Sequence, residues 1–322
     1  MEYNNSHISD PGLKTGEKRN LNALSGKGGV FLLACSRSIF DMRQKKKNGK
    51  FWLSKTLAMV LAAFLLMGLL FGCGFWGSTD KEAEKLPQIV VGSDVYPPFN
   101  YVDADGTPTG IDVELAREAF HRMGYEPKFV TIAWEEKKEL LEQGIIDCIW
   151  GSFSIDGREN QYRWTEPYMY SRQVVAVREN SSIYTLQDLE GKRVAVQSTT
   201  KPEEIFLSHE DPRIPQIREL FSLQNQELLY PYLSKGYADA IAAHETSIMQ
   251  SMVEYDLHYR ILEEPLLTVG LGVAFAKGDE RSLCDDLSQT FRDMREDGTM
   301  EKIIGKYLKN PESYLEVDGN EK

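Results

Sequence analysis

The chain has 322 residues, of which 42% are hydrophobic and 27% charged, and its formal net charge is −12. Residues 73–322 carry 45 acidic against 26 basic side chains, and these 250 residues suffice for one large domain or for two lobes with sizeable cores. A body this acidic repels phosphate backbones and anionic lipid surfaces, which argues against nucleic-acid binding.

The N-terminal part of the chain has the features of a bacterial export signal. Five lysines between residues 45 and 55 precede residues 56–71, which contain no charged side chain. The segment Leu-Phe-Gly-Cys at residues 70–73 resembles the lipobox of bacterial lipoproteins. This resemblance implies that the Cys73 thiol receives a diacylglycerol and becomes the new N-terminus. We therefore predict a lipoprotein signal peptide over residues 42–72.

This N-terminal region leaves one alternative open. The apolar run could be an uncleaved transmembrane helix, because no charge appears between Thr56 and Asp80, but glycines thin out its second half. Either structure places the lysines in the cytoplasm and everything after Ser78 outside. A signal normally begins close to its initiator methionine, so we expect residues 1–41 to be a mis-called start or a disordered extension before Met42.

Residues 73–86 mix small and charged side chains and are expected to form a tether. Beyond them, short apolar runs typical of buried strands alternate with runs of helical spacing. This pattern predicts strands at residues 89–91, 128–132 and 145–150 and helices at residues 111–123 and 134–143. Alternating strands and helices indicate a parallel sheet with helices on its faces.

The same alternation restarts downstream and indicates a second α/β lobe. Its segments are residues 193–197, 202–208, 217–220, 226–235 and 240–243, followed by a helix from Glu245. Residues 268–276 are apolar and contain glycine. The two amphipathic helices that follow, at residues 280–296 and 300–308, have no strand partners of their own, so we expect them to pack back on the first lobe.

These patterns predict a domain organisation with a discontinuous first lobe. We assign residues 87–177 and 270–309 to lobe 1, residues 178–269 to lobe 2 and residues 310–322 to a tail. The body contains only Cys148 and Cys284, which are too few for a disulfide framework and are expected to be free, packed thiols. The histidines show no metal-ligand spacing, so the sequence indicates no metal site.

An ordered series of short motifs runs from about residue 88 to residue 309. It comprises Asp-Val-Tyr-Pro-Pro-Phe at residues 94–99 and further motifs at residues 105–106, 110–115, 141–147, 154–158, 164–168, 189–197, 238–241 and 297–307. The set resembles the family-3 extracellular solute-binding proteins, the polar amino-acid receptors of ABC importers. The resemblance implies a periplasmic-binding-protein-like type II fold. In that fold two crossing strands join two α/β lobes, each a mostly parallel sheet flanked by helices, which close on the ligand.

The resemblance also implies a site for a zwitterion. Arg158 holds the position whose guanidinium pairs with the ligand carboxylate, although the spacing from Ser154 is one residue shorter than usual. The backbone of Ser152 and the side chain of Ser154 resemble the first-lobe acceptors for the ammonium group. The aspartate expected in the second lobe falls on His244, so we assign that role to the adjacent Glu245. A helix N-terminal glutamate stabilised by the dipole is an equal alternative.

Further contacts follow from the same resemblance. Tyr96 and Trp134 match the two stacking positions, which would cover the ligand and exclude water. Thr200 and the backbone near Lys201 resemble the carboxylate donors of the second lobe. Three residues match positions near the distal end of the ligand, and they leave basic, amide and hydroxyl side chains open: Ser93, Asp94 and Gln197.

The sequence thus indicates a lipid-anchored, monomeric receptor without cofactor, which captures a polar amino acid outside the membrane and delivers it to an ABC permease. Ligand binding would drive closure of the lobes, because only the closed form engages both at once. Two alternatives share the fold. One is an enzyme similar to cyclohexadienyl dehydratases, with His244 and Glu245 moving a proton. The other is a sensory ectodomain with a separate signalling partner.

Overall fold

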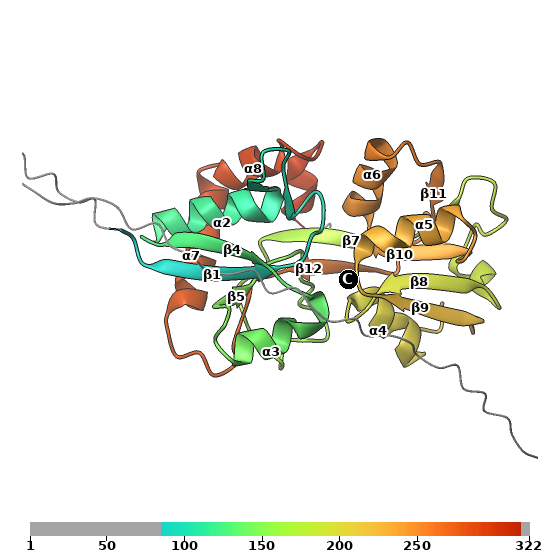
Figure 1. Cartoon of the computed structure of the whole chain (residues 1–322), viewed down its shortest axis with the longest axis horizontal. Coiled ribbons are helices and arrows are strands. Elements are labelled where there is room, and N and C mark those ends of the chain that lie inside the picture. Colours follow the sequence, from blue (N-terminus) through green and yellow to red (C-terminus); the bar gives the residue numbers. More distant parts are fainter. Residues whose placement is uncertain (1–84, 317–322) are drawn as a thin grey trace, which may run out of the picture. The chain divides into compact units, whose positions relative to one another are not determined.

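The structure of the protein is a computed structural model, which describes residues 85–316. The predicted N-terminal extension, signal peptide and lipidated Cys73 lie outside the described residues. Within the described range no helix is both long enough and apolar enough to span a bilayer. The described residues form two α/β lobes, on the left and right of Figure 1. The predicted two-lobed α/β fold is therefore confirmed.

The first lobe contains a five-stranded sheet. Its strands are β1 (Gln88–Ser93), β4 (Glu126–Thr131), β5 (Cys148–Ile149), β6 (Arg163–Trp164) and β13 (Ala274–Phe275). They lie in the order β4-β1-β5-β13-β6, with β1 parallel to both of its neighbours and β13 antiparallel to β5 and β6. A separate hairpin is formed by β2 (Tyr101–Val102) and β3 (Pro108–Thr109).

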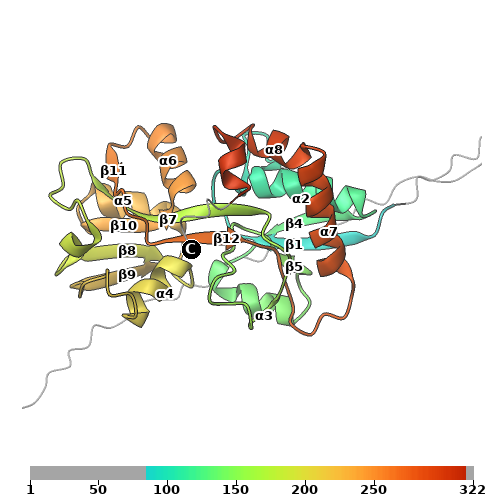
Figure 2. The same cartoon turned by 180° about the vertical axis from the view of Figure 1, so that it is seen from behind.

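Helices cover both faces of this sheet. They are α2 (Ile111–Arg122), η1 (Trp134–Glu136), α3 (Lys137–Glu142), α7 (Leu283–Glu296) and α8 (Thr299–Ile304), with η4 (Pro311–Tyr314) after them. The α2, α7 and α8 helices pack on one face, where the Trp150 ring lies 5.8 Å from that of Phe120 and 5.4 Å from that of Phe291 (Figure 2). The helices after residue 280 therefore pack on the first lobe, as predicted. Cys148 and Cys284 are both buried and free in this lobe.

The second lobe contains a six-stranded sheet. Its strands are β7 (Met169–Arg178), β8 (Arg193–Gln197), β9 (Glu219–Leu223), β10 (Ala240–His244), β11 (Tyr259–Ile261) and β12 (Leu267–Leu271). The order is β11-β7-β10-β8-β9, and β12 also pairs with β7. Every residue of β10 is buried, because the strand has β7 on one side, β8 on the other and helices on both faces.

The helices of the second lobe complete its two cores. They are η2 (Leu186–Leu189), α4 (Lys201–Ser208), η3 (Gln226–Leu228), α5 (Leu229–Ser234) and α6 (Glu245–Glu254). Phe206 of α4 packs with the η2 leucines on one face of the sheet, and α5 and α6 pack on the other. The apolar faces of these short helices are thus buried against strands, which stabilises helices too short to form alone.

Two strands pass between the lobes. β12 is antiparallel to the first half of β7, with Leu267 opposite Gln173 and Leu271 opposite Met169. Figures 1 and 2 show β7 and β12 side by side in the middle of the molecule. Backbone bonds from Ile155 to Gly270 and from Tyr168 to Leu271 tie their ends to first-lobe segments. The two lobes are therefore joined by an antiparallel pair, which can bend without breaking either sheet.

Candidate functional site

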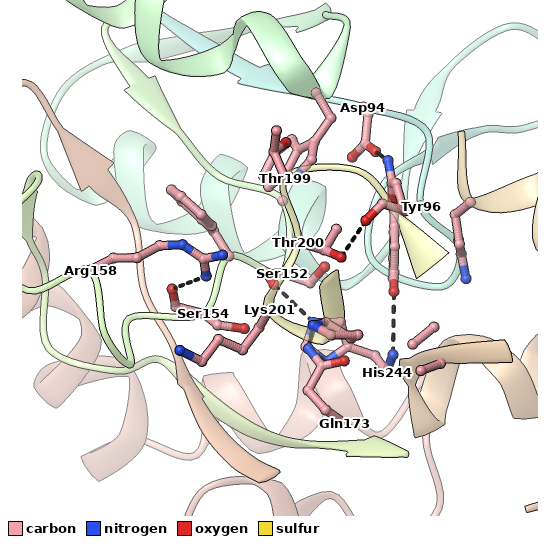
Figure 3. Close-up of a pocket in the computed structure, with 18 residues that line it drawn as sticks. Asp94, Tyr96, Ser152, Ser154, Arg158, Gln173, Thr199, Thr200, Lys201 and His244 are labelled. Atoms are coloured by element: carbon pink, nitrogen blue, oxygen red, sulfur yellow. Dashed lines mark hydrogen bonds between the residues drawn. The ribbon is translucent and has the colours of Figure 1, made fainter. Parts of the chain in front are cut away.

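A pocket of about 420 Å³ lies between the lobes (Figure 3). The segments after β1, β4 and β5 line it from the first lobe, and the segment after β8 and the C-terminal end of β10 line it from the second. Carboxyl ends of parallel strands are the usual ligand sites of open α/β sheets. Eight of the nine ligand-binding residues predicted from the sequence line this pocket: Asp94, Tyr96, Trp134, Ser152, Ser154, Arg158, Gln197 and Thr200.

Asp94, directly after β1, supplies a buried carboxyl group to the pocket. Gln197 at the end of β8 donates from Nε2 to Asp94 Oδ2 at 2.6 Å, so this bond joins the second lobe to the first. Burial raises the pKa of Asp94 to about 6, and the Gln197 hydrogen bond opposes that rise. Gln197 Oε1 has no hydrogen-bond partner among the described residues. Together the two side chains present oxygen acceptors to a ligand.

Two aromatic side chains bound the pocket. Tyr96 is buried, its hydroxyl accepts a bond from the backbone N–H of His244 at 3.4 Å, and its ring lies edge-on to the imidazole at 5.8 Å. Trp134 of η1 is also buried, and its ring packs edge-to-face against Phe153 at 5.2 Å. These contacts fix both rings in place, so they can cover a ligand and exclude water without further ordering.

The loop after β5 is held by a buried carboxyl group. Ser152 has a φ of 43°, a left-handed conformation that side chains rarely adopt. Its N–H donates to Asp112 Oδ2 at 2.7 Å, and the Tyr168 hydroxyl donates to Asp112 Oδ1 at 2.8 Å. Burial raises the pKa of Asp112 to about 7. Asp112 is therefore a positioning residue, which turns the Ser152 backbone toward the pocket.

Arg158 supplies a guanidinium to the other side of the pocket, on the left of Figure 3. Its side chain is 9% exposed, and burial lowers its pKa. Nη1 donates to the carbonyl oxygen of Ser154 at 3.3 Å, and the guanidinium carbon lies 5.4 Å from the centre of the Phe153 ring. Nη2 also lies 3.3 Å from Glu204 Oε2 of the second lobe. The cation is thus pre-positioned to pair with a carboxylate.

The start of α4 approaches Arg158 from the second lobe. The Thr200 side chain donates to the carbonyl oxygen of Gln197 at 2.6 Å, which closes the turn between β8 and α4. Lys201 lines the pocket, and its Nζ pairs with Glu204 Oε1 at 2.8 Å. Gly157, with a φ of 75°, packs against this pair, because a Cβ there would lie 2.8 Å from Lys201 Nζ. The shortened turn before Arg158 thus leaves room for the second-lobe helix.

Lys137, at the start of α3, forms another bridge between the lobes. Its Nζ donates to Trp134 O at 3.0 Å and to Thr199 Oγ1 of the second lobe at 2.8 Å. The ammonium group also lies 4.6 Å from the Trp134 ring centre. Burial lowers the pKa of Lys137 to about 7, and nearby Arg158 acts in the same direction. Next to this bridge, Ser198 donates to the Glu135 carboxylate.

Glu245, the ammonium acceptor that we assigned from the sequence, does not line the pocket. As the first residue of α6 it turns away, and its carboxylate pairs with Arg172 Nη1 at 3.0 Å. His244 lines the pocket instead. It is buried, and burial lowers its pKa to about 4, so the imidazole is neutral at pH 7. The second lobe thus presents a neutral group where a carboxylate was expected.

Sequence reasoning did not identify every residue at the site. Gln173 of β7, Thr199 and Gln226 also line the pocket, and Glu204 contacts Arg158 beside it. Gln173 could have been noticed as a single amide just before the apolar run Val-Val-Ala-Val of residues 174–177. Glu204 could not, because its contact with the first lobe depends on how the two lobes approach each other.

Comparison with known proteins agrees with this geometry. The family model of bacterial extracellular solute-binding proteins, family 3, matches residues 89–310. The histidine-binding periplasmic protein of Salmonella typhimurium is 30% identical over 254 residues, which cover 76% of this chain and 96% of that protein. The L-cystine-binding protein TcyJ of Escherichia coli is 26% identical over 235 residues, which cover 72% and 86% of the two chains.

Solved structures extend the similarity to three dimensions. The substrate binding protein of an amino acid ABC transporter superposes with a TM-score of 0.63 and 26% identity, over 69% of this chain and 99% of that one. A protein crystallised with L-arginine, Tv2483, gives a TM-score of 0.64 with 26% identity, over 69% and 90% of the two chains. The chain therefore belongs to the bacterial extracellular solute-binding proteins, family 3.

Proposed function

We propose that the protein is the extracytoplasmic substrate-binding component of an ABC importer and that it captures a polar amino acid. The observation that carries this proposal is that one pocket between two lobes is lined by both a buried guanidinium, that of Arg158, and a buried carboxyl group, that of Asp94. A zwitterion with a polar side chain offers charges of both signs to such a pocket. The relatives that bind histidine, cystine or arginine support this ligand class.

The ligand carboxylate would pair with Arg158. A guanidinium offers a planar fork that can donate to both carboxylate oxygens, and its low exposure strengthens the interaction. The backbone N–H groups of Thr200 and Lys201, at the start of α4 in the second lobe, would donate to the same carboxylate, because the Thr200 hydroxyl already donates to the carbonyl oxygen of Gln197. Tyr96 and Trp134 would cover the ligand between the two groups of donors and acceptors.

The ligand side chain would meet Asp94 and Gln197. An ionised Asp94 attracts a cationic side chain, and the unpartnered Gln197 Oε1 can accept from a guanidinium, an imidazole or an amide. Asp94 and Gln197 are both buried, so a ligand that offers their oxygen atoms no hydrogen-bond donor binds less tightly. We therefore narrow the proposed ligand to an amino acid with a basic or amide side chain, such as arginine, histidine or glutamine.

Binding would be coupled to closure of the lobes. Ligand contacts on both walls form only when the lobes are together, so the ligand shifts the equilibrium by its differential affinity for the closed form. The permease would then recognise the closed form. No covalent chemistry is part of this mechanism. The buried, neutral His244 has Ser171 and Gln173 as partners, an arrangement suited to holding a ligand more than to proton transfer.

Delivery to a permease requires the protein to stay at the outer face of the membrane. We propose that residues 42–72 are removed as a signal peptide and that Cys73 carries the lipid anchor, with residues 73–86 as tether. The proposed lobes are residues 87–177 with 270–309, and residues 178–269, with β7 and β12 as the two crossing strands, which pair with the second-lobe sheet. The protein would act as a monomer. Replacing Cys73 with serine should abolish lipid processing and release the body from the membrane fraction, and retention of the C73S protein there would refute the anchor.

The proposed function is tested by thermal-shift measurements with the twenty amino acids, prephenate and arogenate. A ligand at one hundred times its dissociation constant stabilises the protein by about 2.7 kcal/mol. We expect basic or amide amino acids to raise the melting temperature without being turned over. Arg158→Lys should weaken binding at least about 100-fold because it loses the planar fork, whereas the distant Arg260→Lys should not. Turnover of prephenate or arogenate, or silence from all twenty amino acids, would overturn the proposal.

A further inference from the structure

Gln173 is a buried pocket residue with one unused polar atom. The side chain lies on β7 at the wall of the pocket, and the residue is 2% exposed. Its Nε2 lies 2.9 Å from His244 Nε2, whereas its Oε1 has no hydrogen-bond partner among the described residues. A buried carbonyl oxygen without a donor is unfavourable. The atom therefore indicates a donor that arrives with a ligand.

The neighbouring imidazole explains why this oxygen stays free. His244 Nδ1 lies 2.9 Å from the Ser171 hydroxyl, and His244 Nε2 lies closer to Gln173 Nε2 than to Ser152 O, at 2.9 and 3.2 Å. Gln173 Nε2 also lies 3.3 Å from His244 Nδ1, so the amide can donate to whichever ring nitrogen carries no proton. The amide is then fixed with Nε2 toward the ring. Its Oε1 remains as an acceptor, and the carbonyl oxygen of Ser152, which has two lone pairs, can accept from a ligand as well.

The charge distribution of the pocket leaves the neutral side chains of Gln173 and His244 without an acidic neighbour in the described pocket lining. Among the described residues that line the pocket, Asp94 is the only acidic side chain, and Gln197 already binds it. Glu245 is held by Arg172 outside the lining. Figure 3 shows Gln173 next to His244 and well separated from Asp94. The part of the pocket around His244 therefore has oxygen acceptors without a negative charge.

We propose that Gln173 Oε1, together with the carbonyl oxygen of Ser152, accepts the hydrogen bonds of the ligand amino group and makes Gln173 a specificity-determining residue. This inference rests on the proposed function, since it assigns one more group of the same ligand. Two neutral carbonyl oxygens form good hydrogen bonds only with amino N–H groups that point toward them. They give less long-range attraction than a carboxylate, so discrimination depends on the geometry of the amide.

The test compares amino acids with analogues that lack only the amino group. The probes are L-arginine with 5-guanidinopentanoate, L-histidine with 3-(imidazol-4-yl)propanoate and L-glutamine with 4-carbamoylbutanoate. Isothermal titration calorimetry on the full chain gives the affinity ratio within each pair. Gln173→Met and Gln173→Leu remove the amide with little change in volume. Gln187→Leu makes the same chemical change on η2, outside the pocket.

We expect the wild-type protein to bind at least one of the three amino acids more tightly than its deamino analogue. Both Gln173 variants should reduce that affinity ratio about 10-fold or more. Affinity for the deamino analogue should change little, and Gln187→Leu should leave the ratio unchanged. Unchanged ratios in both Gln173 variants, with wild-type binding intact, would overturn this inference alone. Absence of wild-type binding to all three amino acids would overturn the proposed ligand class and this inference with it. Melting curves of each variant establish that it is folded.

Discussion

At the scale of single residues, Asp94 is expected to make ligand binding depend on pH. Burial raises its pKa to about 6, so its carboxyl group is ionised at pH 7.5 and mostly protonated at pH 5. A cationic side chain is attracted only by the ionised form. We expect the affinity for L-arginine to fall as the pH drops below about 6, by up to about tenfold for each pH unit.

Asp94→Asn removes the titrating group and tests this expectation. The variant should bind L-arginine weakly at pH 7.5 and show little further change down to pH 5, as measured by calorimetry across that range. Asp105→Asn, on the exposed turn between β2 and β3, is the matched control and should keep the wild-type profile. A profile of Asp94→Asn as steep as that of the wild type would show that another group is responsible.

Glu204 brings a carboxylate to the Arg158 guanidinium, which we propose to pair with the ligand. Its Oε2 lies 3.3 Å from Arg158 Nη2, and its Oε1 accepts from Lys201. The Glu204 side chain is 44% exposed, so its pairing with Arg158 contributes little to stability. Its negative charge nevertheless offsets part of the attraction between Arg158 and a ligand carboxylate.

We therefore expect Glu204→Gln to strengthen amino-acid binding about 3- to 10-fold at low ionic strength, and less at 0.5 M salt because of screening. Calorimetry at both salt concentrations measures the effect, with Glu210→Gln as a control that removes a nearby exposed charge. Weaker binding by Glu204→Gln would show instead that the Arg158–Glu204 contact serves to hold the lobes together.

At the scale of the elements, the sequence best predicted the segments whose apolar residues recur at a regular helical spacing. The α2 helix begins where predicted at residue 111, because its apolar residues recur at helical spacing and are buried. The predicted helix over residues 134–143 is divided into η1 and α3, because Trp134 turns into the pocket. The predicted strand over residues 145–150 keeps only Cys148–Ile149, because residues 145–147 form a bend after Gly144 and the glycine-bearing loop at residues 151–154 follows Trp150.

The sequence was less informative where contacts join distant segments. The ten-residue β7, which carries Gln173, was not singled out, since a continuous apolar run does not by itself define a strand. The position of Arg158 in the pocket agrees with the motif resemblance. The prediction for Glu245 was wrong: His244 is the last residue of β10 and faces the pocket, whereas Glu245 starts α6 and lies outside the pocket lining. One residue of register at a strand end separates a pocket wall from the surface.

Asp112, in the first turn of α2, holds the backbone of the pocket residue Ser152. It accepts bonds from Ser152 N and the Tyr168 hydroxyl. Its pKa rises from 3.8 to about 7 because it is buried. The folded protein therefore holds this proton up to about pH 7, whereas the unfolded chain releases it near pH 4. Between these values the folded state binds more protons, so its stability falls as the pH rises.

Asp112→Asn should remove this contribution. We expect the wild-type free energy of unfolding to include a decrease of about 4 kcal/mol between pH 4 and pH 7 that the variant lacks. Urea unfolding at intervals across that range measures both slopes, and Asp293→Asn on the exposed face of α7 is the control. Equal slopes for the wild type and Asp112→Asn would show that the Asp112 carboxyl group is ionised in the folded protein.

At the scale of the whole molecule, the bonds between the lobes determine how readily they part. Asp94 with Gln197, Lys137 with Thr199 and Arg158 with Glu204 each join the first lobe to the second. Two of these bonds involve residues that would also bind the ligand. Lys137 itself lies outside the pocket lining, with its Nζ 4.6 Å from the Trp134 ring centre, although its partner Thr199 lines the pocket. Removal of the Lys137 ammonium group therefore changes the contact between the lobes without removing a ligand contact.

We expect Lys137→Met to favour separation of the lobes. Methionine keeps much of the buried volume but loses the hydrogen bonds to Thr199 and Trp134, each contributing about 1 kcal/mol. The radius of gyration of the ligand-free protein, measured by small-angle X-ray scattering, should rise. Amino-acid affinity should fall about 3- to 30-fold, because part of the binding free energy is then used to close the lobes.

Lys138→Met on the same helix provides the control, since Lys138 is 54% exposed and its Nζ lies 3.8 Å from Glu142. It should change neither the radius of gyration nor the affinity. At saturating ligand the scattering of Lys137→Met should return to that of the wild type, because the ligand restores contacts on both walls. A Lys137→Met protein with wild-type scattering and weaker binding would place the effect of Lys137 on the Trp134 wall of the pocket and not on closure.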